Sequence, residues 1–322
     1  MAAVAHRILL TGASGTLGGN FIRLAAGAPD IEMLALLRQE SRTPMATPNL
    51  RCVRVDFTDS QSIWETAKQF QPTCVVHCAA TGMEFPKPEW FDLIRFNVDT
   101  TVNLCEVTSR LPGCQFVYIG TGLVYAAQSR ALREDDPLDT LHPYGASKAA
   151  ADLLLRAAAA EFRVPLTILR PFSFTGIGDD RNRLFPSLLR AAVTRQPCPL
   201  SVCDQVRDHC SAVDIAQGIL AAVRSPNVTD AVRVYNLGSG RETSLRTLIE
   251  EVVAQLGLDL ELRFGARGYA RHEPRHFVAD ISRAAAGLHW APRHNLSHAV
   301  WQLARASFPE LVVREPASAL DQ

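Results

Sequence analysis

Apolar runs of strand length alternate with helical patterns through the first half of this 322-residue chain. Runs such as RILLTG (7–12) and CVVHCAA (74–80) are almost continuously apolar, which is typical of strands buried on both faces of a sheet. The pattern predicts strands over 7–12, 31–38, 50–57, 74–80, 114–122 and 164–171. It predicts helices over 17–28, 60–70, 90–111 and 142–162.

Strands separated by helices form parallel sheets, because each connection must cross back over a face of the sheet with a right-handed turn. We therefore expect an α/β fold with a doubly wound, Rossmann-type parallel sheet. After about Arg170 the rhythm loosens, and glycine and proline recur in RPFSFTGIGDD and NLGSGRETS. This change predicts a Rossmann domain over 1–170 and a smaller C-terminal cap over 171–322, with some of its segments returning to the sheet.

Composition excludes several classes of partner. Lysine and arginine balance aspartate and glutamate at 33 each, so no net charge attracts nucleic acid or an anionic membrane. No stretch approaches the roughly 20 apolar residues of a membrane span, and we interpret the N-terminal run as a strand rather than a signal peptide. The eight cysteines form no C-x-x-C pair and no zinc-type spacing. We expect reduced thiols, no metal and a cytoplasmic location.

The segment TGASGTLG (11–18) follows the first predicted strand and opens the first predicted helix. Its glycines are Gly12, Gly15 and Gly18, one residue more widely spaced at the start than in the usual G-x-G-x-x-G fingerprint. Glycines at this point let the backbone turn sharply and approach a pyrophosphate, while Ser14 and Thr16 add hydroxyl donors. The same spacing can serve a plain tight turn, but its place after strand one predicts dinucleotide binding.

The ends of the next strands bear on the choice of cofactor. Arg38 stands where NAD-binding chains carry an acidic residue, and an arginine there can hold the 2′-phosphate of NADP. The alternative is that Arg38 is a solvated surface residue and the cofactor is NAD. Asp56 closes the third predicted strand and can accept a hydrogen bond from the adenine amine. Ala79 and Ala80 close the fourth predicted strand and are small enough for the cofactor to lie close.

Tyr144 and Lys148 lie one turn apart at the start of the helix predicted over 142–162. A free tyrosine, with a pKa of about 10, exchanges protons poorly at neutral pH. A nearby ammonium group and the positive helix N-terminus both favour the phenolate, so the phenol becomes usable as a general acid or base. Thr121, at the end of the fifth strand, can hold the substrate oxygen. A Y-x-x-x-K pair alone is common on helix surfaces. Together with Thr121 and the glycine loop, it becomes a specific signal of a catalytic site.

With these motifs, and with VVHCAA, PYGASKAAAD, VRDHCSAVDIA and DISRAAAGLHWAP, the chain resembles the extended short-chain dehydrogenase/reductase family of nucleotide-sugar epimerases, dehydratases and reductases over nearly its whole length. The resemblance implies a nucleotide-sugar substrate, a homodimer, and catalysis by Thr121, Tyr144 and Lys148. Our expected cofactor contacts also include Leu17, Phe57, Asn97, Tyr144, Lys148 and Pro171. Our expected substrate contacts are Thr81, Thr121, Ser173, Arg207, Arg271 and Arg275.

Departures from the family pattern reduce the number of reactions to consider. Dehydratases of the group carry Asp-Glu directly after the catalytic threonine, whereas Gly122 and Leu123 stand here, which argues against water elimination. Two enzymes remain, a 4-ketoreductase that consumes NADPH and a 4-epimerase that retains NAD, and Arg38 tilts the prediction slightly to the reductase. A non-catalytic NADP sensor or scaffold is the alternative from another class. Met83, Phe85 and Trp90 are expected either to line a sugar pocket or to pack a lid.

Overall fold

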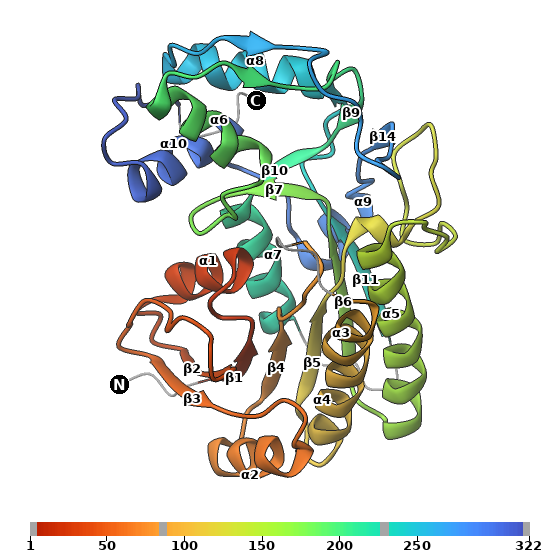
Figure 1. Ribbon diagram of the computed structural model, residues 1–322. Coiled ribbons are helices and arrows are strands. Elements are labelled where there is room, and N and C mark those ends of the chain that lie inside the picture. The colour runs from red at the N-terminus through yellow and green to blue at the C-terminus, as the bar shows by residue number, and fades with distance from the viewer. Residues whose placement is uncertain (1–4, 84–88, 226–231, 318–322) are drawn as a thin grey trace.

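The computed structural model describes residues 5–83, 89–225 and 232–317. A seven-stranded sheet, with every neighbouring pair parallel and the order β11-β6-β5-β4-β1-β2-β3, forms its centre (Figure 1). The strands are β1 (His6–Thr11), β2 (Ile31–Leu37), β3 (Leu50–Arg54), β4 (Cys74–His77), β5 (Gln115–Ile119), β6 (Leu166–Pro171) and β11 (Val232–Leu237). The predicted doubly wound α/β fold is confirmed.

Helices cover both faces of this sheet because successive strand residues point to opposite sides. Ile8 and Leu10 of β1 join the core beneath α1 (Thr16–Ala25), α7 (Ala212–Arg224) and α9 (Ser282–Leu288). Leu9, between them, joins the core beneath the helices of the other face. These are α2 (Ser60–Phe70), α4 (Thr100–Ser109) and α5 (Pro143–Phe162). The near-continuous apolar runs of the sequence thus reflect burial on two sides.

A third apolar core lies in the C-terminal part, above the sheet in Figure 1. It is built by α6 (Leu184–Thr194), α8 (Leu245–Leu256) and α10 (Leu296–Ser307). The small strands of this half are β7 (Ser173–Thr175), β8 (Cys198–Pro199), β9 (Val206–Arg207), β10 (His209–Ser211), β12 (Thr243–Ser244), β13 (Leu262–Arg263) and β14 (His276–Phe277). The chain crosses between the two halves more than once. Although both elements follow Arg170, α7 packs on the central sheet and β11 is one of its strands.

The helix expected over 90–111 contains an irregularity. It runs as α3 (Trp90–Ile94), a π-helical turn (Arg95–Asp99) and α4, without leaving the right-handed helical region between them. The Thr100 hydroxyl donates to the carbonyl of Arg95, five residues earlier, at 3.1 Å. A π turn shifts the side chains that follow it around the helix, and such turns often accompany functional sites. Here it carries Asn97, which is buried.

The strand order reverses between β1 and β4, and ligands of doubly wound sheets bind in the crevice at such a reversal. The glycine loop follows β1, and Cys78 to Thr81 follow β4, so both segments flank this crevice. No helix of the described residues is long and apolar enough to span a membrane. Within the same residues, no group of three or more histidine, cysteine, aspartate or glutamate side chains could hold a metal ion.

Candidate active site

The glycine loop between β1 and α1 is packed too tightly for other residues at two positions. Gly12 has a φ of +71°, and a Cβ there would lie 2.5 Å from the backbone nitrogen of Ala79. A Cβ on Gly18 would lie 2.2 Å from the carbonyl oxygen of Gly12. The N-cap of α1 is Gly15, and no side chain caps this helix, so its first N–H groups have no partner from a capping residue. Uncapped N–H groups beside a close-packed loop fit the phosphates of a dinucleotide.

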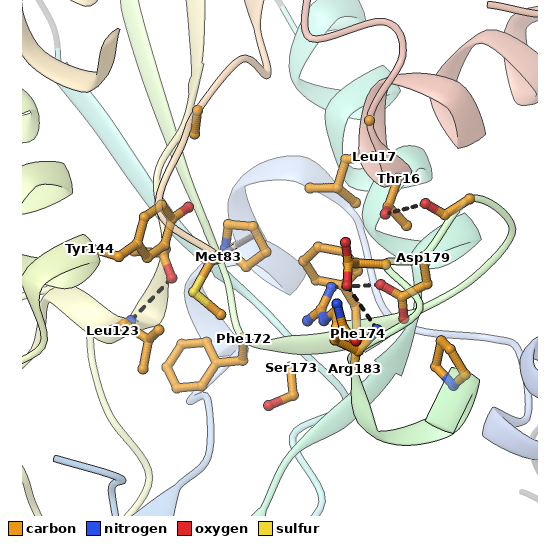
Figure 2. Close-up of a pocket in the computed structure, with 18 of the residues that line it drawn as sticks. Thr16, Leu17, Met83, Leu123, Tyr144, Phe172, Ser173, Phe174, Asp179 and Arg183 are labelled. Atoms are coloured by element: carbon orange, nitrogen blue, oxygen red, sulfur yellow. Dashed lines mark hydrogen bonds and ion pairs between the residues drawn. The ribbon is translucent and has the colours of Figure 1, made fainter. Parts of the chain in front are cut away.

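A cavity of about 1040 Å³ extends from this loop to the C-terminal cap. Its lining includes the predicted residues Gly12, Ser14, Gly15, Thr16, Leu17, Gly18, Ala80, Thr81, Thr121, Tyr144, Pro171, Ser173, Arg207 and Arg271. Figure 2 shows Tyr144, Leu123, Met83 and Phe172 on one side of the view, Thr16, Asp179 and Arg183 on the other, and Ser173 between them. The fold therefore brings the glycine loop, the catalytic candidates and residues of the cap to one space.

Two local structures place the catalytic candidates. Pro143 begins α5, and Tyr144 follows it in the first turn, half-buried, where the positive end of the helix dipole is strongest. Thr121 lies two residues after the end of β5 and caps a short 3₁₀ helix (Gly122–Val124), with its hydroxyl oxygen accepting the N–H of Leu123 at 3.2 Å. The hydroxyl proton of Thr121 is therefore still available to a substrate oxygen.

Lys148 lies behind Tyr144 on α5 and is 1% exposed. Its ammonium donates to the carbonyl oxygen of Ile119 at 2.8 Å and lies 4.2 Å from the ring centroid of Tyr118. Burial lowers the pKa of Lys148 from 10.5 to about 7, and the charges of Cys78 and Asp152 oppose that shift. The lysine is not among the residues that line the cavity and lies within its wall.

Asn97 fixes the segment that follows β4. Its side-chain oxygen accepts the N–H of Thr81 at 2.9 Å, and its amide donates to the carbonyl of Thr81 and the hydroxyl of Ser147, both at 2.8 Å. The π turn thereby ties the wall of the cavity at Thr81 to α5. Since Tyr144 and Lys148 flank Ser147 on that helix, Asn97 couples the crevice to the catalytic candidates.

A buried histidine that sequence reasoning did not single out supports the same wall. The Thr101 hydroxyl donates to the carbonyl of Asn97 at 2.7 Å, so it accepts from Nε2 of His77 at 3.0 Å. Nδ1 of His77 then accepts the hydroxyl of Thr11 at 2.6 Å, and the oxygen of Thr11 accepts the N–H of Ala79 at 3.2 Å. Burial lowers the pKa of His77 to about 3, which keeps the ring neutral in this chain of bonds.

Several predicted contacts lie outside the cavity lining. Asp56, Phe57 and Ala79 follow strands β3 and β4, and Asp56 accepts bonds from the backbone and hydroxyl of Thr58. Arg38 is exposed, with its guanidinium 5.5 Å from the ring centroid of Phe96, and Arg42 lines the cavity instead.

Some of the residues predicted in the cap and in the segment after β4 line the cavity, and others do not. Arg275 forms an ion pair with Asp204 at 2.7 Å and is also absent from the lining. Met83 lines the cavity, whereas Trp90 is 64% exposed. Phe85 lies outside the described residues.

The cavity also contains polar and aromatic groups that the sequence did not point out. Asp179 accepts from the Thr175 hydroxyl at 2.7 Å and from Arg183 at 2.9 Å, and burial raises the pKa of this carboxyl. Phe172 stacks on Phe277 with ring centroids 4.5 Å apart. The i, i+4 spacing of Asp179 and Arg183 could have indicated their ion pair from the sequence. No local pattern in the sequence links residues 172 and 277.

The model of the NAD dependent epimerase/dehydratase family matches residues 8–238 of the chain. This match starts in β1 and runs to the end of β11, so it includes the glycine loop, Thr121, Tyr144 and Lys148. It therefore covers every strand of the central sheet.

Individual proteins match over most of their length. The UDP-glucose 4-epimerase of Azospirillum brasilense is 26% identical over 320 residues, covering 91% of this chain and 89% of that protein. The dTDP-glucose 4,6-dehydratase of Streptomyces griseus is 28% identical over 309 residues, covering 90% of each. The solved structure of MoeE5 in complex with UDP-glucuronic acid and NAD has a TM-score of 0.83 at 24% identity, covering 95% of this chain and all of that one. That likeness shows the same fold.

Proposed function

Because this chain belongs to the NAD-dependent epimerase/dehydratase family, whose members are enzymes, we propose that it is a nucleotide-sugar 4-epimerase. Tyr144 and Thr121 line the same cavity as the glycine loop, and this single observation carries the proposal. A nicotinamide dinucleotide, when bound, takes up and returns a hydride. The relatives named as 4-epimerases support the reaction, and the glycine loop supports the cofactor.

In this proposal the chain's own residues handle the proton of the sugar's 4-hydroxyl. The phenolate of Tyr144 accepts that proton as carbon 4 is oxidised and returns it when carbon 4 is reduced. The Thr121 hydroxyl donates a hydrogen bond to the same sugar oxygen and so orients it. Lys148, with its ammonium held by the Ile119 carbonyl, stabilises the phenolate electrostatically. Ser14, Gly15, Thr16 and the first turn of α1 would hold the phosphates of the dinucleotide.

The site argues against water elimination. Gly122 and Leu123 occupy the positions of the acid and base that follow the threonine in dehydratases of the resembled group. A Cβ on Gly122 would lie 2.8 Å from the ring of Phe172, and this ring is fixed between Phe277 and Tyr125. An acidic side chain at position 122 would therefore displace the Phe172 ring. This packing supports a reaction in which only carbon 4 changes.

One observation favours a second candidate, a 4-ketoreductase that uses NADPH. Arg38 follows β2, Arg42 lines the cavity, and among the described residues neither forms an ion pair with a carboxylate. Two such arginines at the end of β2 can bind a 2′-phosphate. The structural relatives named as NAD complexes support NAD instead, so cofactor identity separates the two candidates.

Substrate contacts and assembly complete the proposal. Arg207 and Arg271 line the cap side of the cavity and would meet the substrate diphosphate, while Ser173 and Thr81 would meet the sugar. Trp90 and Phe91 of α3 are 64% and 84% exposed, and leucines of α5 are exposed as well, which supports a homodimer through these helices. A cytoplasmic location stays a prediction.

The experiment starts from the protein as purified. Its bound dinucleotide is released by denaturation and identified by mass spectrometry, and the protein is then incubated with UDP- and dTDP-hexoses. An epimerase carries NAD and forms the carbon-4 epimer with no net change in nicotinamide absorbance. A reductase oxidises added NADPH in step with consumption of a 4-keto sugar nucleotide. If no sugar nucleotide is isomerised, oxidised or reduced, both candidates are wrong and the non-catalytic sensor gains support.

A further inference from the structure

Three apolar side chains surround the position of the proposed chemistry. Gly82 packs on the Tyr144 ring so closely that a Cβ there would lie 2.9 Å from it, and the next residue, Met83, enters the cavity lining. Leu123 enters the lining two residues after Thr121, which binds its N–H. Phe172 lines the cavity beside both, as Figure 2 shows. Met83, Leu123 and Phe172 are called the apolar wall below.

The apolar wall is rigid on two of its sides. Phe172 is 3% exposed, stacks on Phe277, and its N–H donates to the carbonyl of Leu237 at 2.8 Å. Leu123 packs partly against the same small core. A Cβ on Gly145 would lie 2.4 Å from the Leu123 carbonyl, so the first turn of α5 fixes this backbone. A fixed wall discriminates between substituents, because it does not rearrange to provide a new hydrogen-bond partner.

Several polar groups near the wall already have roles or partners. The Thr121 hydroxyl accepts the Leu123 N–H and has one donor for the reacting oxygen. Asn97 holds both backbone groups of Thr81. Two cations of the cavity are engaged as well, Arg183 with Asp179 and Arg207 with Glu273. A hydroxyl or carboxylate placed on the apolar wall would therefore lose water without a matching partner there.

The reacting carbon 4 is flanked by carbon 3, which carries an oxygen, and by carbon 5, which carries the carbon-6 substituent. The carbon-3 oxygen lies beside the reacting oxygen and can use the hydroxyl of Ser173, which lines the cavity. The carbon-6 substituent extends beyond the ring and can be a methyl, a hydroxymethyl or a carboxylate group. Resting on the proposed function, we infer that the apolar wall is a subsite for the methyl group of a 6-deoxy sugar.

The test uses two pairs of nucleotide sugars, and the members of each pair differ only at carbon 6. The first pair is dTDP-6-deoxyglucose and dTDP-glucose, and the second is UDP-glucuronic acid and UDP-glucose. The holoenzyme should prefer the 6-deoxy sugar by roughly 10- to 100-fold in kcat/KM, the range that one buried apolar group provides. Leu123→Asn should reduce this ratio, while the matched Leu123→Met keeps the wall apolar and should keep the ratio. Met83→Gln, at a position 43% exposed, gives a second polar variant if Leu123→Asn does not fold.

Dissociation constants of the same sugars for Tyr144→Phe protein separate binding from chemistry. A 6-deoxy preference in these constants supports the subsite even if turnover fails, in which case only the proposed function is lost. An equal or greater preference for the hydroxymethyl or carboxylate sugar overturns the inference while the 4-epimerase proposal stands. A ratio unchanged in Leu123→Asn and Met83→Gln also overturns it. Failure of every sugar to bind overturns both.

Discussion

Burial of Lys148 should make the protein less stable than it would be without this lysine. In the unfolded chain the pKa of the group is 10.5, and in the fold it is about 7. Between these values the unfolded state binds an extra proton, so this group's contribution to the free energy of unfolding rises with pH through that range. Below pH 7 the full difference applies and corresponds to about 5 kcal/mol of destabilisation, from about 1.4 kcal/mol per pKa unit.

Lys148→Met keeps the length of the side chain and removes the titrating group. It also removes the hydrogen bond to the Ile119 carbonyl, which costs about 1–2 kcal/mol. At pH 6.5 the variant freed of nucleotide should therefore be more stable than the original chain by about 3 kcal/mol, and at pH 9.5 the two should differ little. Urea unfolding at both pH values measures this, with Lys68→Met, at an exposed position of α2, as the matched control.

Two results would refute this reasoning. Lys148→Met could be the less stable protein at pH 6.5, in which case its ammonium is well solvated or paired in the fold. The difference could also be the same at both pH values, in which case Lys148 does not titrate between them. If the reasoning holds, the stable variant should be inactive, because the charge that destabilises the fold is the one that acts on Tyr144.

Three other perturbations test separate parts of the structure. Arg38→Asp should shift the ratio of kcat/KM for NADP and NAD toward NAD by at least tenfold, and an unchanged ratio would show that Arg38 does not contact the 2′-phosphate. Asn97→Ala removes three buried hydrogen bonds and should lower the free energy of unfolding by about 2–4 kcal/mol in urea titrations, whereas a loss below 1 kcal/mol would mean that water replaces the amide. Phe91→Asp should convert a dimer to a monomer in analytical ultracentrifugation, and an unaltered sedimentation coefficient would place the interface elsewhere.

Patterns with a local cause were accessible from the sequence. Near-continuous apolar runs identified six strands of the central sheet, and Gly12 and Gly18 stand where no Cβ fits. Tyr144 and Lys148 were found because an i, i+4 pair behind Pro143 needs only helical geometry. The seventh strand, β11, was not assigned, because it lies after the rhythm of strands and helices has loosened.

Features that depend on residues far apart in the chain were not accessible. The stacking of Phe172 on Phe277 depends on the cap folding back over the sheet. The position of Arg38 against Phe96 depends on the π turn, and the sequence 90–111 indicated only a regular helix. The low pKa of Lys148 follows from burial beneath β4 and β5, which the helix alone does not reveal.

The central claim is that Tyr144 moves the proton of the 4-hydroxyl while a hydride leaves carbon 4 and returns to it. Following a labelled hydrogen at carbon 4 tests this claim most directly. The holoenzyme and Tyr144→Phe are each incubated with UDP- and dTDP-glucose carrying deuterium at carbon 4, and the products are followed by NMR. The account predicts that the holoenzyme forms the carbon-4 epimer with deuterium still at carbon 4, and that Tyr144→Phe forms none. Loss of the deuterium to water, or an equal yield of epimer from Tyr144→Phe, would contradict it.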